Sequence, residues 1–369
     1  MIKFTTGNML TTDVEALVNT VNTQGVMGKG IALQFKKAFP DMFKVYLDAC
    51  KAGKVFTGQM HVVTLNSIVN PRYIINFPTK QDWRRPSQML YIESGLQDLV
   101  RLVRELGISS IAVPPLGCGN GGLPWSLVQP KIEAAFSELP KVRVLLFAPH
   151  GAPDADKMLN RTARPPMTLS RAVVLKLLQQ YCVLGYELTL LEVQKLLYFM
   201  QEFGEPLRLR FEKKYYGPYA DNLRHVLNLF EGHFTSGFAD GNNKPDTVIR
   251  LLPRAVEEAS DYIMLNHGED NDHVERLKQV AALIEGFESP YGMELLSSVH
   301  WLIKHEQVSP NFITDAVKEW NPRKAKLMKP KHIEIAWQRL CSTDKTGENP
   351  KQMKYIPWWA DPQRENAAK

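Results

Sequence analysis

Residues 18–30 read Val-Asn-Thr-Val-Asn-Thr-Gln-Gly-Val-Met-Gly-Lys-Gly. The segment begins as an apolar, β-branched run, passes through a glycine-rich loop and leads into a helical pattern that starts near Ile31. Residues 114–125, Pro-Pro-Leu-Gly-Cys-Gly-Asn-Gly-Gly-Leu-Pro-Trp, follow another apolar run and repeat this order. Because glycine loops that open helices expose backbone N–H groups, the two segments predict a diphosphate held from both sides. Tight turns without a ligand are the alternative.

Short apolar runs alternate with helical patterns through the whole first half, which predicts an α/β fold with a sheet between helices. The expected strands are 2–4, 16–21, 60–65, 73–77, 111–113 and 142–147, and the expected helices are 30–39, 43–52, 91–106 and 125–138. Prolines and turn residues then predict a linker. Beyond it, helix-spaced residues such as Leu190, Val193 and Leu197 predict a mainly α-helical domain. The expected division is domain 1–152, linker 153–167 and domain 168–369.

Length and composition agree with two globular domains. The chain has 369 residues, more than the roughly 250–300 at which a single core stops growing. Apolar residues make up 44% and charged residues 23%, which excludes a disordered or collagen-like chain. The four cysteines form no Cys-x-x-Cys pair, and the histidines show no metal-ligand spacing, so no metal or cofactor is expected. Without a signal sequence or a long apolar run, we expect a cytoplasmic protein with no membrane partner.

Charge is distributed unevenly along the chain. Residues 1–150 hold 16 Lys and Arg against 10 Asp and Glu, whereas residues 151–369 hold 29 of each. A basic first domain predicts a polyanionic ligand. Within the second half, residues 255–294 carry ten acids against two basic residues, and residues 318–369 carry twelve basic residues against six acids. The acidic block is either a solvated helix face or a surface for a basic partner. The basic tail, with Trp358 and Trp359, is a helix end, a DNA-tracking arm or part of a partner contact.

A third segment, residues 77–86, combines a lysine with an aromatic and basic cluster. Lys80 is its candidate nucleophile, since desolvation or neighbouring cations ease the loss of a lysine proton. Trp83, Arg84 and Arg85 form the kind of group that holds single-stranded nucleic acid. An exposed loop lysine is the alternative for Lys80. Cys118 lies between glycines with no histidine near it in sequence, which argues against a nucleophilic cysteine.

Taken together, four separated motifs resemble a macrodomain, the ADP-ribose-binding α/β module. They are Gly7-Asn8-Met9-Leu10, Val18 to Asn22, Gly25 to Gly30, and Pro114 to Gly119. With Lys80 and the Gly-Cys-Gly loop, the chain resembles the terminal ADP-ribose glycohydrolase branch, in particular the DarG antitoxins of DarT/DarG pairs. That family removes ADP-ribose from thymine in single-stranded DNA. Most macrodomains carry Asp in place of Asn8, and hydrolases acting on protein carboxylates carry an acid where Asn120 and Gly121 stand.

The resemblance implies roles for individual residues. Lys80 would attack or polarise the anomeric carbon of the distal ribose, and Asn22 would orient that ribose, so both are candidate catalytic residues. Asn8 and Met9 would lie at the adenine end. The residues expected to bind ADP-ribose are Asn8, Met9, Thr20, Thr23, Gly25, Val26, Met27, Gly28, Gly30, Thr79, Leu116, Gly117, Cys118, Gly119, Asn120, Gly121, Gly122 and Leu123.

Residues 170–310 resemble the Panacea, or SocA-like, antitoxin domain, through Leu190 to Phe199 and Tyr215-Tyr216-Gly217-Pro218-Tyr219. Gly217-Pro218 is expected to be a turn. The resemblance implies that this domain binds and neutralises a DarT-type toxin, and the acidic block would occupy the toxin's basic DNA groove. The whole chain is therefore expected to be a bifunctional antitoxin. The alternatives are a non-catalytic ADP-ribose reader with an interaction module, and a hydrolase for protein-linked ADP-ribose.

Overall fold

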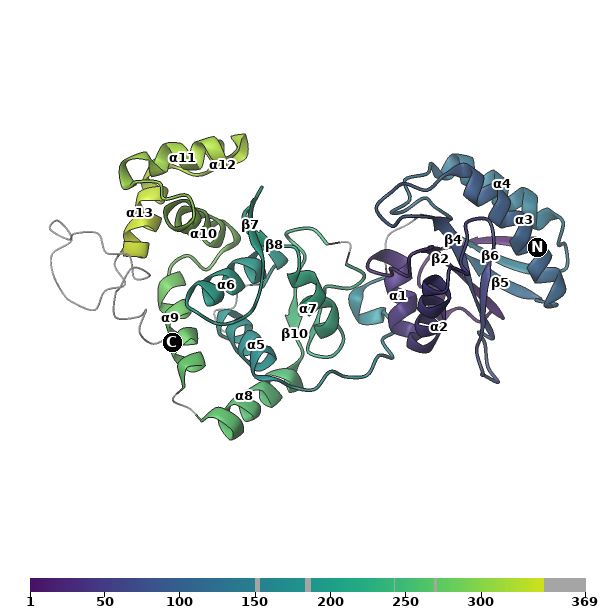
Figure 1. The fold of residues 1–369 in the computed structure, drawn as a ribbon, viewed down its shortest axis with the longest axis horizontal. Coiled ribbons are helices and arrows are strands. Elements are labelled where there is room, and N and C mark those ends of the chain that lie inside the picture. Colours follow the sequence, from purple (N-terminus) through teal and green to yellow (C-terminus); the bar gives the residue numbers. More distant parts are fainter. Residues whose placement is uncertain (150–152, 183–186, 242, 269–270, 342–369) are drawn as a thin grey trace. The chain divides into compact units, whose positions relative to one another are not determined.

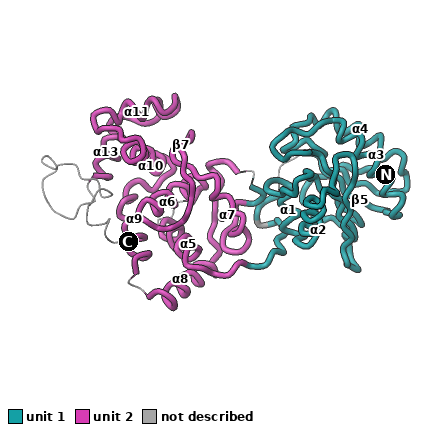
Figure 2. The backbone as a smooth tube through the Cα atoms, viewed as in Figure 1, with its two compact units in different colours: residues 1–164, 239–242 teal, residues 165–238, 243–369 magenta. Residues whose placement is uncertain are grey.

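The protein forms two compact units in the computed structural model, which describes residues 1–149, 153–182, 187–241, 243–268 and 271–341. Unit 1 comprises Met1–Arg164 with Ala239–Asn242, and unit 2 comprises Pro165–Phe238 with Asn243–Lys369 (Figure 2). Unit 1 has a sheet between helices and unit 2 is largely helical, which confirms the predicted fold class (Figure 1). Among the described residues, no helix has the length and apolarity needed to cross a membrane.

Unit 1 is built on a six-stranded sheet with strand order β1-β6-β5-β2-β4-β3. Every neighbouring pair is parallel except β3 and β4, which are antiparallel. The strands are β1 (Ile2–Thr5), β2 (Ala16–Asn22), β3 (His61–Thr64), β4 (Tyr73–Lys80), β5 (Ser110–Val113) and β6 (Arg143–Phe147). Because β2, β4 and β5 run parallel, their carboxyl ends, and the loops that follow them, meet at one edge of the sheet.

Helices cover both faces of this sheet. They are α1 (Gly30–Ala38), α2 (Pro40–Lys51), α3 (Met89–Glu105) and α4 (Trp125–Ser137), with the short 3-10 turns η1 (Met9–Thr11) and η2 (Ala155–Lys157). Alternate residues of β2 point to opposite faces, as a pleated strand requires. Val18 packs in the core with α3 and α4, whereas Leu17 and Val21 pack in the core with α1 and α2. The sheet therefore forms the middle of three layers (Figure 1).

The predicted strands and helices of unit 1 all occur, with one informative difference. The sequence pattern ends the fourth strand at Phe77 and places Lys80 in the following loop, whereas β4 continues to Lys80. β3 pairs with β4 only as far as Asn76, so beyond it β4 has a partner on one side only. Pro78, which lacks an N–H group, is tolerated in such an edge position. Lys80 is therefore fixed by a strand rather than by a loop.

Unit 2 is organised around α6 (Leu190–Glu202), in which every residue from Leu190 to Met200 is buried. The helix starts with a capping box, in which the Thr189 hydroxyl accepts from the Glu192 N–H while the Glu192 side chain reaches back to the Thr189 N–H. The other helices are α5 (Leu169–Cys182), α7 (Leu223–Phe230), α8 (Pro253–His267), α9 (Asp272–Ile284), α10 (Pro290–Lys304), α11 (Ile313–Trp320), α12 (Pro322–Leu327) and α13 (Pro330–Cys341), and η3 covers Pro310–Phe312. Trp358 and Trp359 lie outside the described residues.

Two short antiparallel ribbons, β7 (Phe211–Lys214) with β8 (Gly217–Ala220) and β9 (Thr235–Ser236) with β10 (Arg250–Leu251), accompany these helices. The prediction of a turn at Gly217-Pro218 is wrong. Lys214 pairs with Gly217, so Tyr215 and Tyr216 form the turn and Gly217 starts the returning strand. The backbone φ of Gly217 is +96°, a conformation that a side chain would disfavour.

The acidic block 255–294 is not one continuous surface. Glu294, in α10, is 1% exposed and accepts hydrogen bonds from Arg323 (2.7 and 3.0 Å) and Lys324 (2.6 Å). Two cations in α12 thus neutralise it inside unit 2, with Lys195 of α6 donating nearby to the Pro218 carbonyl. Burial lowers the pKa of Lys195 to about 7 and that of Lys324 to about 8. Glu269 and Asp270 lie outside the described residues, whereas Glu257 and Asp261 are exposed on α8.

Candidate active site

The last residues of β2 and β4 form the base of the candidate site. Asn22 and Lys80 are register partners, and the Thr23 N–H donates to the Lys80 carbonyl at 3.1 Å. The Thr23 hydroxyl donates to the Gln81 carbonyl at 3.0 Å, so the chains leaving the two strands remain connected. Two predicted catalytic residues that are 58 positions apart in sequence are thereby brought side by side. The parallel pairing of β2 and β4 brings these two residues together.

The first glycine loop is folded by the side chain of Asn22. The Asn22 amide nitrogen donates to the Val26 carbonyl at 2.6 Å, and its oxygen accepts from the N–H groups of Gln24 (2.9 Å) and Val26 (3.2 Å). With only 6% of its surface exposed, Asn22 shapes the loop from within. Gly25 turns the chain at a φ of +80°. The nitrogen and the oxygen of the Asn22 side-chain amide are thus both bonded to the loop backbone. The contact of Asn22 with the distal ribose stays a prediction.

The second glycine loop, residues 116–123, is held by its own backbone. Cys118, Gly122 and Leu123 donate N–H groups to carbonyls of Pro115, Gly119 and Gly117 at 3.0–3.1 Å. Within the loop, Gly121 lies so close to Gly117 that an added Cβ would be 2.2 Å from the Gly117 carbonyl oxygen. Backbone this crowded excludes any side chain at position 121. The sequence therefore needs glycine here for packing, in addition to any role toward a ligand.

Lys80 connects the end of β4 to the second glycine loop. Its Nζ donates to the carbonyl oxygen of Asn120 at 2.5 Å, so the tip of the second glycine loop lies over the end of β4. Partial burial lowers the pKa of Lys80 below its usual value. A neutral amine could donate one N–H to this carbonyl and keep its lone pair for another atom. The contact involves the backbone carbonyl of Asn120 and not its side chain.

Other predicted residues occupy distinct parts of unit 1. The Asn8 oxygen accepts from the Leu10 N–H at 3.0 Å, and its amide nitrogen donates to the Lys157 carbonyl at 2.9 Å, so Asn8 ties η1 to η2. Burial raises the pKa of the Cys118 thiol to about 11, which agrees with its expected lack of nucleophilicity. Among the other predicted residues that are not glycines, Met9, Met27, Thr79 and Leu116 are buried, whereas Thr20 is half-buried and Val26 is exposed.

The predicted DNA-contact residues lie just beyond Lys80. Trp83 is 44% exposed, and the Arg84 guanidinium lies 4.7 Å from the centre of its ring. Asp82 fixes the loop by accepting from the Arg84 N–H at 2.8 Å. The backbone N–H of Trp83 donates to the side-chain oxygen of Gln24 at 3.5 Å, which links this loop to the first glycine loop. An exposed, cation-stacked indole beside Lys80 is suited to stacking on an unpaired base.

Sequence reasoning did not select Gln24, Tyr46 or Ser87 as site residues, although Gln24 belongs to the segment 18–30 and all three contact site residues. Tyr46 lies beneath the first glycine loop, and the Ser87 N–H donates to the Gly121 carbonyl at 2.9 Å. Neither Tyr46 nor Ser87 belongs to a motif with a chemical signature, so no pattern could have found them. Within the described residues, no group of three or more His, Cys, Asp or Glu side chains is placed to hold a metal ion.

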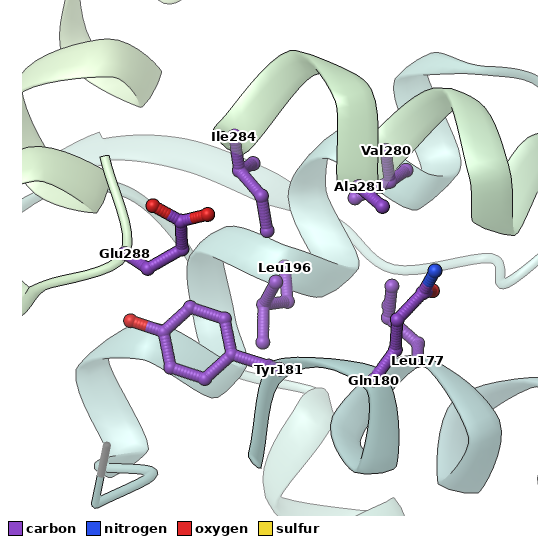
Figure 3. A pocket seen from close by; sticks show the side chains of 8 residues that line it. All are labelled: Leu177, Gln180, Tyr181, Leu196, Val280, Ala281, Ile284 and Glu288. Carbon is purple, nitrogen blue, oxygen red and sulfur yellow. The ribbon is translucent and has the colours of Figure 1, made fainter. Parts of the chain in front are cut away.

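A separate small pocket in unit 2 lies between α5, α6 and α9 (Figure 3). Its lining contains none of the predicted site residues. Tyr181 contributes the phenol seen in the figure, but its hydroxyl donates to Glu192 of α6 and is already engaged. The pocket is lined by Leu177, Gln180, Tyr181, Leu196, Val280, Ala281, Ile284 and Glu288.

Comparison with known proteins finds relatives of this chain. The Macro domain family matches residues 18–132. A Thermus aquaticus protein named DNA ADP-ribosyl glycohydrolase is 46% identical over 341 residues, which cover 92% of this chain and 93% of that protein. A Thermosipho africanus DNA ADP-ribosyl transferase-DNA ADP-ribosyl glycohydrolase fusion protein is 35% identical over 39% of this chain and 40% of its own length. The solved macrodomain of Mycobacterium tuberculosis DarG is 54% identical over 41% of this chain and 99% of its own, with a TM-score of 0.40.

Proposed function

From the premise that this chain belongs to the DNA ADP-ribosyl glycohydrolase family, we propose that it hydrolyses the N-glycosidic bond between ADP-ribose and thymine in single-stranded DNA. In this reaction the bond from the anomeric carbon to the thymine nitrogen breaks, water supplies the new hydroxyl, and the nitrogen recovers a proton. The products are free ADP-ribose and unmodified DNA. The observation that carries the proposal is the 46% identity to a DNA ADP-ribosyl glycohydrolase over 92% of this chain, and the contact between Lys80 and the Asn120 carbonyl supports it by joining the candidate lysine to the second glycine loop.

The two glycine loops would hold ADP-ribose through backbone N–H groups, because such loops place several donors around a diphosphate. The distal ribose would then lie between Asn22 and the tip of the second loop, beside Lys80. As the glycosidic bond breaks, positive charge develops at the anomeric carbon. A neutral Lys80 amine could stabilise that centre by bonding to it and yielding to water, or by supporting the attacking water. A lowered pKa supports either role.

A direct test presents the full chain with two substrates and one ligand. They are a single-stranded oligonucleotide with ADP-ribosyl-thymine, a peptide with ADP-ribosyl-glutamate, and free ADP-ribose as a binding ligand. We expect release of ADP-ribose from the oligonucleotide. Release from the peptide alone would replace the proposal by a protein-linked ADP-ribose hydrolase. Binding of ADP-ribose without release from either substrate would indicate a reader.

Replacing Trp83 with alanine is expected to raise KM for the modified oligonucleotide about tenfold, because stacking of one base contributes roughly 1–3 kcal/mol. Affinity for free ADP-ribose should stay within twofold, since Trp83 lies on the DNA side of Lys80 in the proposed arrangement. Steady-state hydrolysis and calorimetric ADP-ribose binding measure the two effects. Phe56→Ala, at an exposed aromatic residue of unit 1 outside the Trp83 loop and both glycine loops, is the matched control. An unchanged KM would remove Trp83 from the DNA contact.

We further propose that unit 2 binds a DarT-type toxin. A relative that fuses a DNA ADP-ribosyl transferase to the glycohydrolase supports a partnership between these two activities. The outer face of α8, with Glu257 and Asp261 exposed and Glu258 half-buried, offers negative charge to a protein that must bind DNA. Glu294 is excluded from this surface because it is buried.

Reversing Glu257, Glu258 and Asp261 to lysine is expected to weaken toxin binding at least tenfold and to flatten its dependence on salt, since like charges would then meet at the interface. Titration of labelled toxin at two salt concentrations provides the measurement. The control reverses the exposed acids Asp41 and Asp48 of α2 in unit 1. Unchanged affinity would place the toxin contact elsewhere on unit 2.

A further inference from the structure

Tyr46 lies directly beneath the site but carries no part of the mechanism described so far. It belongs to α2, is 0% exposed, and its hydroxyl donates to the Asn22 carbonyl oxygen at 2.5 Å. Burial raises the pKa of this hydroxyl far above its usual value, so it remains a proton donor. Asn22 is thus held through both its backbone and its side chain. Its backbone is fixed by Tyr46 from below, and its side chain fixes Gln24 and Val26 above.

The surroundings of Tyr46 leave it little freedom. Its ring packs edge-on against His61 of β3, with centroids 6.2 Å apart. The next residue, Leu47, lies so close to the first glycine loop that a Cβ at Gly25 would come within 2.7 Å of its Cδ1. α2 therefore forms a packed floor for the loop. Movement of this floor would be transmitted to Asn22, whose register partner is Lys80.

We propose that Tyr46 is a positioning residue for hydrolysis, which acts by holding the Asn22 carbonyl so that the end of β2 keeps Lys80 and the first glycine loop in reacting geometry. The inference rests on the proposed hydrolysis. The connection has three links: the Tyr46 hydroxyl to the Asn22 carbonyl, Asn22 to the loop, and the Thr23 N–H to the Lys80 carbonyl at 3.1 Å. Tyr46 itself touches no substrate, because its side chain is fully buried.

The test replaces Tyr46 with phenylalanine in the full chain, which removes one oxygen and keeps the ring. The buried Asn22 carbonyl then loses a hydrogen-bond donor, which costs about 1–3 kcal/mol. If about 1.4 kcal/mol of that cost is added to the activation barrier, the rate falls about tenfold. We expect kcat to fall about tenfold. KM for the modified oligonucleotide and the Kd of free ADP-ribose should both stay within twofold, since the glycine loops still provide their donors.

Two controls separate positioning from loss of stability. Tyr73→Phe removes a phenol oxygen from half-buried Tyr73 of β4, and Val144→Ala truncates a buried side chain of β6. Val144→Ala should lower the melting temperature by more than Tyr46→Phe while kcat stays within twofold. Tyr46→Phe with unchanged kcat, or with KM and kcat changed together, would overturn the inference while wild-type release of ADP-ribose still supports the proposed function. Absence of release by wild type would instead contradict the function itself.

Discussion

Replacing Lys80 with alanine is expected to abolish release of ADP-ribose from ADP-ribosyl-thymine, by at least a thousandfold, while free ADP-ribose still binds within about threefold. Lys80 is the titratable side chain that the structure places under the tip of the second glycine loop, through its bond to the Asn120 carbonyl. In the proposed arrangement, ADP-ribose is bound by backbone N–H groups of the two glycine loops, and Lys80→Ala removes none of these groups. Removing a group that acts only on the reacting atoms lowers kcat without a matching loss of ground-state affinity.

The assay follows free ADP-ribose released from the modified oligonucleotide, and calorimetry measures ADP-ribose binding. Lys54→Ala, at an exposed lysine of the same unit, is the matched control and should retain full activity. Turnover by Lys80→Ala near the wild-type rate would remove Lys80 from catalysis.

Lys80→Arg refines the result. Arginine keeps a positive charge but cannot lose its proton in a protein. Partial activity of this variant would therefore indicate an electrostatic role, and complete loss would indicate that the neutral amine is required.

Replacing Glu294 with glutamine is expected to lower the free energy of unfolding of unit 2 by about 3 kcal/mol, because removal of one partner leaves other buried charges uncompensated. The carboxylate is 1% exposed and accepts hydrogen bonds from both Arg323 and Lys324. Lys324, whose pKa is already lowered to about 8, can release its proton when Glu294 is lost. That proton release limits the loss of unfolding free energy. We therefore expect a loss at the lower end of the range of about 3–5 kcal/mol that is typical when one partner of a buried ion pair is removed.

Scanning calorimetry of the full chain measures the change, and ADP-ribose release measured below the transition should be unaffected because Lys80 and both glycine loops belong to unit 1. Glu257→Gln on α8 is the control, since an exposed carboxylate contributes little to stability. Equal melting temperatures for the two variants would show that the buried cluster does not stabilise unit 2.

The periodicity of the sequence was sufficient for the architecture of unit 1 and for the helical character of unit 2. Every expected strand and helix of the first half occurs, because apolar alternation and helical spacing act over a few residues. The same local signals failed at Lys80 and at Gly217. β4 extends past Pro78 because of how its neighbours pair, and the turn falls at Tyr215 and Tyr216 because Lys214 pairs with Gly217.

Candidate residues could be selected from sequence and resemblance, but their contacts could not. The bond from Lys80 to the Asn120 carbonyl joins positions 40 residues apart, and the Tyr46 bond to Asn22 joins a helix to a strand end. In the sequence, Glu294 is one of the ten acids of residues 255–294. Only the structure shows that it is buried and bonded to Arg323 and Lys324. By itself, the sequence determined the order of elements and the glycine loops, and it selected Lys80 as the candidate catalytic lysine. The tertiary structure decided which of these groups meet, because burial and pairing between distant residues arise only when the chain folds.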